Sequence, residues 1–177
     1  MEIRLYRNYN ASFVFETIGD EDRAGVIDLW RRTQALPSGE SAERRVSEIV
    51  IVVRESSSGM VVAVNSVFRA KLNPESEEYY IFRSFIDPAH RGGRLILFMT
   101  RFAYEALNEM YRPGSPAGLF FFTDNKKLQR SCIMERIKRE GFEYLGRGPL
   151  GRDIWRKLFV SVMGNDDGRV LQELEKQ

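Results

Sequence analysis

The stretch YYIFRSFIDPAHRGGRLILFMTRFAYEALNEMY, residues 79–111, decides the fold. Its first part, Tyr79 to Ile86, is rich in aromatic and β-branched residues, which favour a β-strand. Asp87-Pro88 ends that strand, because proline has no amide donor and biases the residue before it towards an extended conformation. A short basic loop that contains two glycines follows at residues 90–94. The stretch therefore begins with a strand and a tight loop.

The residues after the loop carry an apolar stripe at helical spacing. Its members are three or four residues apart, which places them on one face of a helix. We therefore expect a helix over residues 94–111 whose striped face is buried. The stripe consists of Leu95, Met99, Phe102, Ala103, Ala106, Leu107 and Met110.

A strand, a glycine loop and a helix N-terminus in this order predict an anion site. The first amides of a helix have no intrahelical acceptor, and the helix dipole adds partial positive charge there. Gly92 and Gly93 allow a close backbone approach, while Arg91 and Arg94 add fixed charge. Phosphate or pyrophosphate suits such a site best. The alternative is that the glycines only form the turn and the arginines are solvated.

Length and composition indicate one globular domain. The chain has 177 residues, of which 43% are hydrophobic and 29% charged, and such a chain can bury a sizeable core. Its net charge of +2 is too small to favour nucleic acid as a partner. We assign residues 1–163 to a single domain and residues 164–177 to a polar C-terminal tail.

Cysteine and histidine usage argues against disulfides and metal. Cys132 and His90 are the only residues of their types, so neither an internal disulfide nor a zinc ligand set is expected. We expect Cys132 to be half-buried on a helix. The N-terminus has no apolar signal segment, and no run of about 18 apolar residues occurs. A cytoplasmic protein that does not enter a membrane is therefore expected.

Other parts of the chain give strand and helix signals in a defined order. The strands from residues 48 to 86 should form an antiparallel meander, and the very apolar GLFFFT segment should be a strand covered on both faces. Strands are expected at residues 3–6, 12–18, 48–54, 60–72, 79–86, 118–123, 142–145 and 153–162. Helices are expected from residue 20 to the Leu36-Pro37 stop, at 41–48 with Ser41 as cap, at 94–111 and at 125–140, with a frayed helix at 167–176.

Two of these helices have a predicted buried side. In the first helix, Ala24, Ile27 and Trp30 lie on one side. The helix at 125–140 begins after Asp124 and ends at Gly141, a residue type common just past a helix C-terminus. Its candidate core residues are Leu128, Cys132, Ile133 and Ile137.

With this order of elements, residues 12–159 resemble the GNAT-type acyl-CoA N-acyltransferase superfamily. Ile86-Asp87-Pro88-Ala89-His90-Arg91-Gly92 is similar to the hydrophobic-x-Pro-x-x-Arg-Gly start of the family's pyrophosphate loop. Asn125 after an apolar strand, followed by a helix that closes on Gly141-Phe142, resembles the family's fourth-helix motif. The resemblance implies an α/β (α+β) fold with a mixed, mostly antiparallel central sheet and helices on both faces.

The resemblance also implies a function: direct transfer of an acyl group, most simply acetyl, from acetyl-CoA or another acyl-CoA to a primary amine. The strand that ends at Ile86 should separate from the strand at 118–123, and its free backbone groups should then hold the pantetheine arm. No metal is needed. The proton of the amine would pass to Tyr80, Glu78 or Tyr79. The implied donor-site residues are Phe85, Ile86, His90, Arg91, Gly92, Gly93, Arg94, Leu95 and Asn125.

Three positions depart from the family pattern. Arg94 and Ile96 stand where the family has further loop glycines, and Ile137 stands where a tyrosine often serves as general acid. Two alternatives therefore stay open: a GNAT-fold module that binds a ligand or partner without catalysis, and an acyl-carrier-protein-dependent acyltransferase related to homoserine-lactone synthases. The acceptor could be a small-molecule or a peptide amine, and an edge strand or the tail could support a homodimer.

Overall fold

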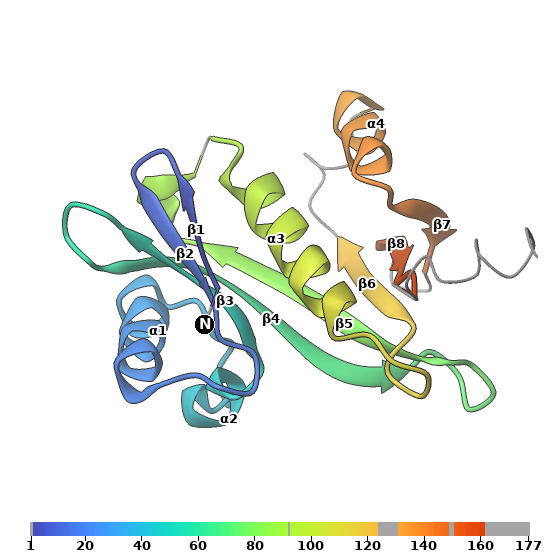
Figure 1. Cartoon of the computed structure of the whole chain (residues 1–177), viewed down its shortest axis with the longest axis horizontal. Coiled ribbons are helices and arrows are strands. Elements are labelled where there is room, and N and C mark those ends of the chain that lie inside the picture. The colour runs from blue at the N-terminus through green and yellow to red at the C-terminus, as the bar shows by residue number, and fades with distance from the viewer. Residues whose placement is uncertain (1, 92, 124–130, 149–150, 162–177) are drawn as a thin grey trace, which may run out of the picture.

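The computed structural model describes residues 2–91, 93–123, 131–148 and 151–161 (Figure 1). The predicted tail and its frayed helix lie outside these residues. In chain order, the elements are β1 (Ile3–Tyr6), β2 (Tyr9–Phe13), α1 (Asp20–Thr33), α2 (Ala42–Val46), β3 (Ile49–Glu55), β4 (Val61–Lys71), β5 (Glu78–Ile86), the 3-10 turn η1 (Pro88–His90), α3 (Leu95–Glu109), β6 (Gly118–Thr123), α4 (Ser131–Arg139), β7 (Glu143–Arg147) and β8 (Asp153–Leu158).

The described strands form one sheet in the order β1-β2-β3-β4-β5-β6-β8-β7. Neighbouring strands are antiparallel except for β5 and β6, which run parallel. One hydrophobic cluster joins α3 and α4 to one face of the sheet, and a second joins α1 and α2 to the opposite face. Figure 1 shows α3 crossing the strands and α1 and α2 lying together apart from it. The predicted mixed, mostly antiparallel sheet with helices on both faces is confirmed.

The apolar stripe of α3 is buried, as its spacing predicts. Six of its seven members, from Leu95 to Leu107, are buried, and Phe102 has no exposed surface. Met110 is the exception, because the helix ends at Glu109 and the side chain of the capping Met110 is 45% exposed. The prediction for Met110 is therefore wrong.

The face that α1 buries differs from the predicted one. Val26, Leu29 and Trp30 are buried, whereas Ala24 is exposed and Ile27 is half-buried. The reason is a close approach at Gly25, where an added Cβ would lie 2.6 Å from a methyl group of Val61 on β4. This contact turns the Gly25 side of the helix, and with it the next residue, towards the sheet.

The second strand of the chain lies earlier in the sequence than predicted. The expected strand at 12–18 is β2, which ends at Phe13, because the amide of Thr17 bonds to the carbonyl of Val14 in a turn where Glu16 has a φ of +59°.

Two caps match the sequence. Ser41 accepts the amide of Arg44 at 3.2 Å, and Gly141 follows α4 with a φ of +84°.

The described part of α4 corrects one prediction. Ile137 is buried and Ile133 is half-buried, but Cys132 is exposed rather than half-buried, because it lies on the solvent side of the helix. Residues 125 and 128, which belong to the same predicted helix, lie outside the described residues. In the described part of the chain, none of the helices has the length and apolar character needed to cross a membrane.

Candidate functional site

The sheet opens between its two parallel strands. β5 and β6 pair only at Tyr80 with Leu119 and at Ile81 with Phe120. Beyond this point β6 continues to pair with β8 as far as Thr123, while β5 runs on to Ile86 beside β4. The predicted separation of the two strands is confirmed, and among the described residues the edge of β5 from Phe82 onward has no strand partner on the β6 side.

A cavity of about 770 Å³ occupies this opening. We call it the large cavity. Its walls come from the second half of β5, the basic loop, the first turns of α3, the end of β6 and the described part of α4. Gly92 and Asn125 lie outside the described residues. The other predicted donor-site residues all line it: Phe85, Ile86, His90, Arg91, Gly93, Arg94 and Leu95.

One end of the large cavity is suited to an anion. Helix α3 begins at Leu95 without a side-chain cap on its first amides, so these amides can bind a ligand. Arg91 and Arg94 line the same cavity. The Nε of Arg91 donates to the carbonyl of Ile86 at 2.9 Å, which holds the side chain over the cavity and leaves its two terminal nitrogens for a ligand.

His90 is held in place by a residue that sequence reasoning missed. The hydroxyl of Tyr9, on β2, lies 3.1 Å from Nδ1 of His90, and the two rings meet edge to face at 5.8 Å. This contact engages Nδ1, so Nε2 is the ring nitrogen left for a ligand. No local signal in the sequence joins residues so far apart.

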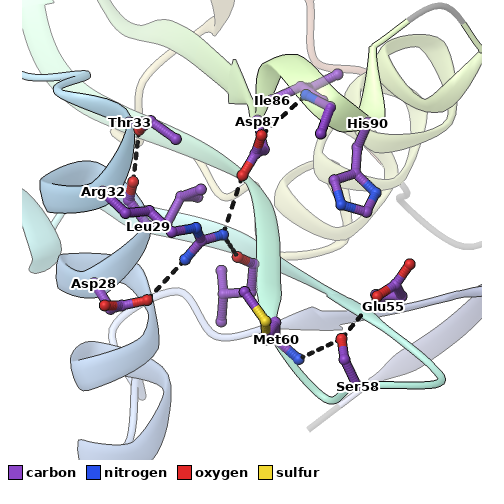
Figure 2. A network of polar contacts seen from close by, with 12 residues as sticks. Asp28, Leu29, Arg32, Thr33, Glu55, Ser58, Met60, Ile86, Asp87 and His90 are labelled. Atoms are coloured by element: carbon purple, nitrogen blue, oxygen red, sulfur yellow. Dashed lines mark hydrogen bonds and ion pairs between the residues drawn. The ribbon is translucent and has the colours of Figure 1, made fainter.

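A polar network ties α1 to the start of the loop (Figure 2). Asp87 accepts the amide of Ala89 at 3.0 Å and Nη2 of Arg32 at 3.3 Å. The same nitrogen of Arg32 donates to the carbonyl of Val61 at 2.6 Å, while its Nη1 donates to Asp28 at 2.8 Å. The Ala89 amide, followed by Arg32, holds the pKa of Asp87 below its usual value. Asp87 directly before Pro88 is a capping signal in the sequence. Nothing in the sequence around Arg32, its partner on α1, indicates this contact.

Ile137 and Ser84 both line the large cavity. Ile137, at the position where the family often has a tyrosine, forms part of the cavity wall and is only 9% exposed. Ser84 is exposed in the wall, and its Oγ accepts Nδ2 of Asn65 at 2.6 Å. Because this oxygen is already an acceptor, its own proton is free to point towards a ligand.

The three predicted catalytic residues lie at the other end of β5. Tyr79 is buried against Phe120, and Tyr80 is buried between Phe15 and Phe159. Burial raises the pKa of Tyr80. Glu78 is half-buried at the start of the strand. None of the three lines the large cavity, so the structure does not bring them to it, and their catalytic role stays a prediction.

A second cavity, of about 260 Å³, lies on the α1 and α2 side of the sheet. We call it the small cavity. It is lined by the end of α1 and the following loop, by α2, and by β4 and β5. Arg83, Ser84 and Phe85 line both cavities. The two cavities therefore share lining residues on the part of β5 that has separated from β6.

Comparisons with known proteins give matches among solved structures only, since neither a family model nor a curated protein matches the chain. A ribosomal-protein-S5-alanine acetyltransferase from Vibrio fischeri is 11% identical, with a TM-score of 0.61 over 90% of this chain and 97% of that one. A protein described as an acetyltransferase from Salmonella typhimurium, solved with its cofactor acetyl-CoA, is 11% identical, with a TM-score of 0.58 over 90% and 99%.

A GNAT family N-acetyltransferase from Escherichia coli, solved in complex with CoA, is 16% identical, with a TM-score of 0.57 over 88% of this chain and 85% of that one. At such identities the likeness concerns the fold and not the substrate. It agrees with the sheet order, with the single parallel pair among the described strands and with the helices on both faces. The chain has the fold of the GNAT N-acetyltransferases.

Proposed function

We propose that this protein is an N-acyltransferase that moves an acyl group, most simply acetyl, from acyl-CoA directly to a primary amine. The observation that carries the proposal is the opening between β5 and β6 beyond Ile81, with a cavity of about 770 Å³. This volume lies within the range of about 300–1,000 Å³ that small-molecule sites occupy.

The residues of the large cavity fit an acyl-CoA donor. Arg91, Arg94 and the first amides of α3 would hold the pyrophosphate by charge-assisted hydrogen bonds. The free edge of β5 from Phe82 to Ile86 would hold the pantetheine arm through its backbone groups. Amides of the same edge would polarise the thioester carbonyl. The bound donor supplies the activated acyl group.

The acceptor amine would reach the donor from the small cavity, which shares Arg83, Ser84 and Phe85 with the large one as lining residues. A carbon–nitrogen bond then forms, the carbon–sulfur bond breaks, and coenzyme A leaves as a thiolate. The amine must also lose a proton to a base. Tyr80, Glu78 and Tyr79 stay our candidates, and each would act through intervening water, since none lines the large cavity.

A missing general acid leads to a testable prediction at Ile137. Isoleucine cannot protonate the departing thiolate, and acid–base assistance typically contributes about 10²–10⁴-fold. Coenzyme A is a stable leaving group, so water can serve as the donor. We expect Ile137→Tyr to keep or raise turnover. Ile137→Ala should mainly lower stability, by about 2 kcal/mol or more, because it leaves a gap in the wall.

Thiol release from acetyl-CoA with one responsive amine measures both variants, and urea unfolding measures their stability. Ile137→Val, which keeps a branched side chain, is the matched control. If Ile137→Ala strongly lowers turnover while its folding and its affinity for coenzyme A stay intact, the position takes part in catalysis in a way that this account does not contain.

The proposed function itself is tested by thiol release from acetyl-CoA in the presence of pools of primary amines. Amine-dependent release supports it. Binding of coenzyme A without release under any pool would favour a non-catalytic module. Transfer from an acyl-carrier protein but not from acyl-CoA would favour the relative of homoserine-lactone synthases.

Location, acceptor class and assembly belong to the same proposal. We place the protein in the cytoplasm, where acyl-CoA and amine acceptors occur together. The similar structure from Vibrio fischeri is named for an alanine of a ribosomal protein, which supports a peptide acceptor as one class beside small molecules. A homodimer could form through β1, which among the described strands pairs with β2 alone and has an exposed Leu5.

A further inference from the structure

Two arginines, Arg45 from α2 and Arg83 from β5, are the charged residues among the lining of the small cavity. The other lining side chains are apolar, such as Trp30 and Leu36, or carry a small hydroxyl, as Ser66 and Ser84 do. The cavity therefore combines apolar walls with two guanidinium groups. This combination suits a small ligand with one anionic group.

Two carboxylates hold these guanidiniums in position from outside the cavity. Glu48 forms ion pairs with Nη2 of Arg83 and, at 3.4 Å, with Nε of Arg45. Glu40 pairs with Nη1 of Arg45. Neither carboxylate is among the lining residues, whereas both arginines are. The two carboxylates balance the two positive charges.

The guanidinium of Arg83 keeps unused hydrogen-bonding capacity. The Nε of Arg83 is buried and has no hydrogen-bond acceptor among the described residues, while the Nε of Arg45 is buried and has its ion-pair contact with Glu48 at 3.4 Å. The guanidinium of Arg83 lies 4.5 Å from the centre of the Phe68 ring, so an aromatic ring covers one of its faces. A buried donor without an acceptor is costly.

The electrostatics of Arg83 agree with this geometry. Burial, followed by the positive charge of Arg45, lowers the pKa of the Arg83 guanidinium. Glu48, which contacts both guanidiniums, and Glu40 act in the opposite direction and raise this pKa. The two guanidiniums therefore stand close enough for one carboxylate to contact both, as Glu48 does.

We propose that Arg45 and Arg83 bind the carboxylate of the acceptor, and that the acceptor is a small amino acid rather than a neutral amine. This inference rests on the proposed function. The forked guanidinium matches a carboxylate in geometry, and the volume of about 260 Å³ accommodates a compact molecule. The carboxylate end lies at the arginines, and the amine end lies at Ser84 and Phe85, where the donor cavity begins.

The inference also separates two classes of acceptor. In a free amino acid the carboxylate is close to the amine, whereas in a peptide an amide takes its place. An amide carries no charge for the two guanidiniums, which would then keep Glu48 and Glu40 as their anionic partners. A peptide N-terminus should therefore be a poor substrate, unlike the acceptor for which the Vibrio fischeri structure is named.

The test compares matched pairs of acceptors by thiol release from acetyl-CoA. Each L-amino acid of a panel, with β-alanine and γ-aminobutyrate added, is compared with its own carboxamide and with an Ala-Gly-Gly tripeptide. We expect the best acid to exceed its carboxamide in kcat/KM by about 10- to 150-fold, which corresponds to a charge-assisted contact. The difference should appear mainly in KM.

Arg83→Gln removes one charge while Glu48 keeps Arg45 as a partner. It should reduce the preference for the acid over its carboxamide at least tenfold, and Arg45→Gln should act in the same direction. Arg31→Gln, on α1 and with 73% of its side chain exposed, is the matched control and should keep the full preference. Circular dichroism checks that every variant is folded.

Equal rates with acids and carboxamides, or a faster reaction with the tripeptide, would overturn the inference while the proposed function stands. If no amine releases thiol, saturation-transfer NMR with N-acetyl-L-alanine and its carboxamide, both with coenzyme A present, still decides. The inference is supported if N-acetyl-L-alanine binds, its carboxamide does not, and Arg83→Gln abolishes binding of the acid. It is overturned if neither compound binds. Calorimetry with coenzyme A reports separately on the donor site, so the two failures are distinguishable.

Discussion

Replacing Phe102 with aspartate should lower the free energy of unfolding by about 4 kcal/mol or more, which is enough to leave little folded protein. Phe102 lies on α3 with no exposed surface, and removing a buried phenylalanine alone costs about 3–5 kcal/mol. The new carboxylate would be buried as well. Arg4 lies 4.4 Å from the ring centre, but it already pairs with Glu2 and Glu105.

Urea unfolding followed by circular dichroism measures this loss. The matched control is Met110→Asp, because Met110 belongs to the same apolar stripe in the sequence but is 45% exposed. A surface substitution of this kind usually changes stability by about 0.5 kcal/mol or less. Similar losses in the two variants would contradict the orientation of α3 on the sheet.

Removing both arginines at the start of α3 should weaken coenzyme A binding about 10²–10⁴-fold. Arg91 and Arg94 line the large cavity beside the first amides of the helix. Each charge-assisted contact contributes about 1.5–3 kcal/mol, and neighbouring contacts need not add fully. The single variant Arg91→Ala should lose about 1.5–3 kcal/mol of binding free energy.

Calorimetric titration of coenzyme A into the wild type, the single variant and the Arg91→Ala, Arg94→Ala double variant measures these losses. Arg112→Ala is the matched control, because Arg112 is exposed just beyond the other end of α3 and donates to the carbonyls of Glu109 and Tyr111. Unchanged affinity in the double variant would remove both arginines from the donor site.

The central unit of the fold could be predicted because its signals are local. An aromatic strand, a proline and an apolar stripe at helical spacing lie within residues 79–111. They predict β5, the loop and α3 without any knowledge of distant contacts. The predicted burial of the stripe was wrong only at Met110, where the helix ends. Helix ends depend on caps and on neighbouring segments, and these are less visible in sequence.

The supports of the candidate site could not be predicted, because they join residues far apart in the chain. The contact from Tyr9 to His90 spans 81 residues, and the one from Arg32 to Asp87 spans 55. The face of α1 was also set by a tertiary contact, the approach of Gly25 to Val61. Such contacts depend on the folded sheet and leave no pattern in a short window.

The tyrosines of β5 illustrate the same limit. Alternation along a strand places Tyr79 and Tyr80 on opposite faces, and in the structure they do belong to different hydrophobic clusters. Their burial depends on rings from distant segments, including Phe15 and Phe159, which cover Tyr80. The sequence could therefore assign the faces but not the accessibility that a direct catalytic role would need.

The central claim is that the opening between β5 and β6 binds acyl-CoA, and hydrogen–deuterium exchange with and without saturating acetyl-CoA tests it most directly. The account predicts slower exchange in β5 from Phe82 onward, in the loop with the first turn of α3, and at the end of β6, with β1 unaffected. Protection confined to other elements, or no protection at any acetyl-CoA concentration, would contradict it.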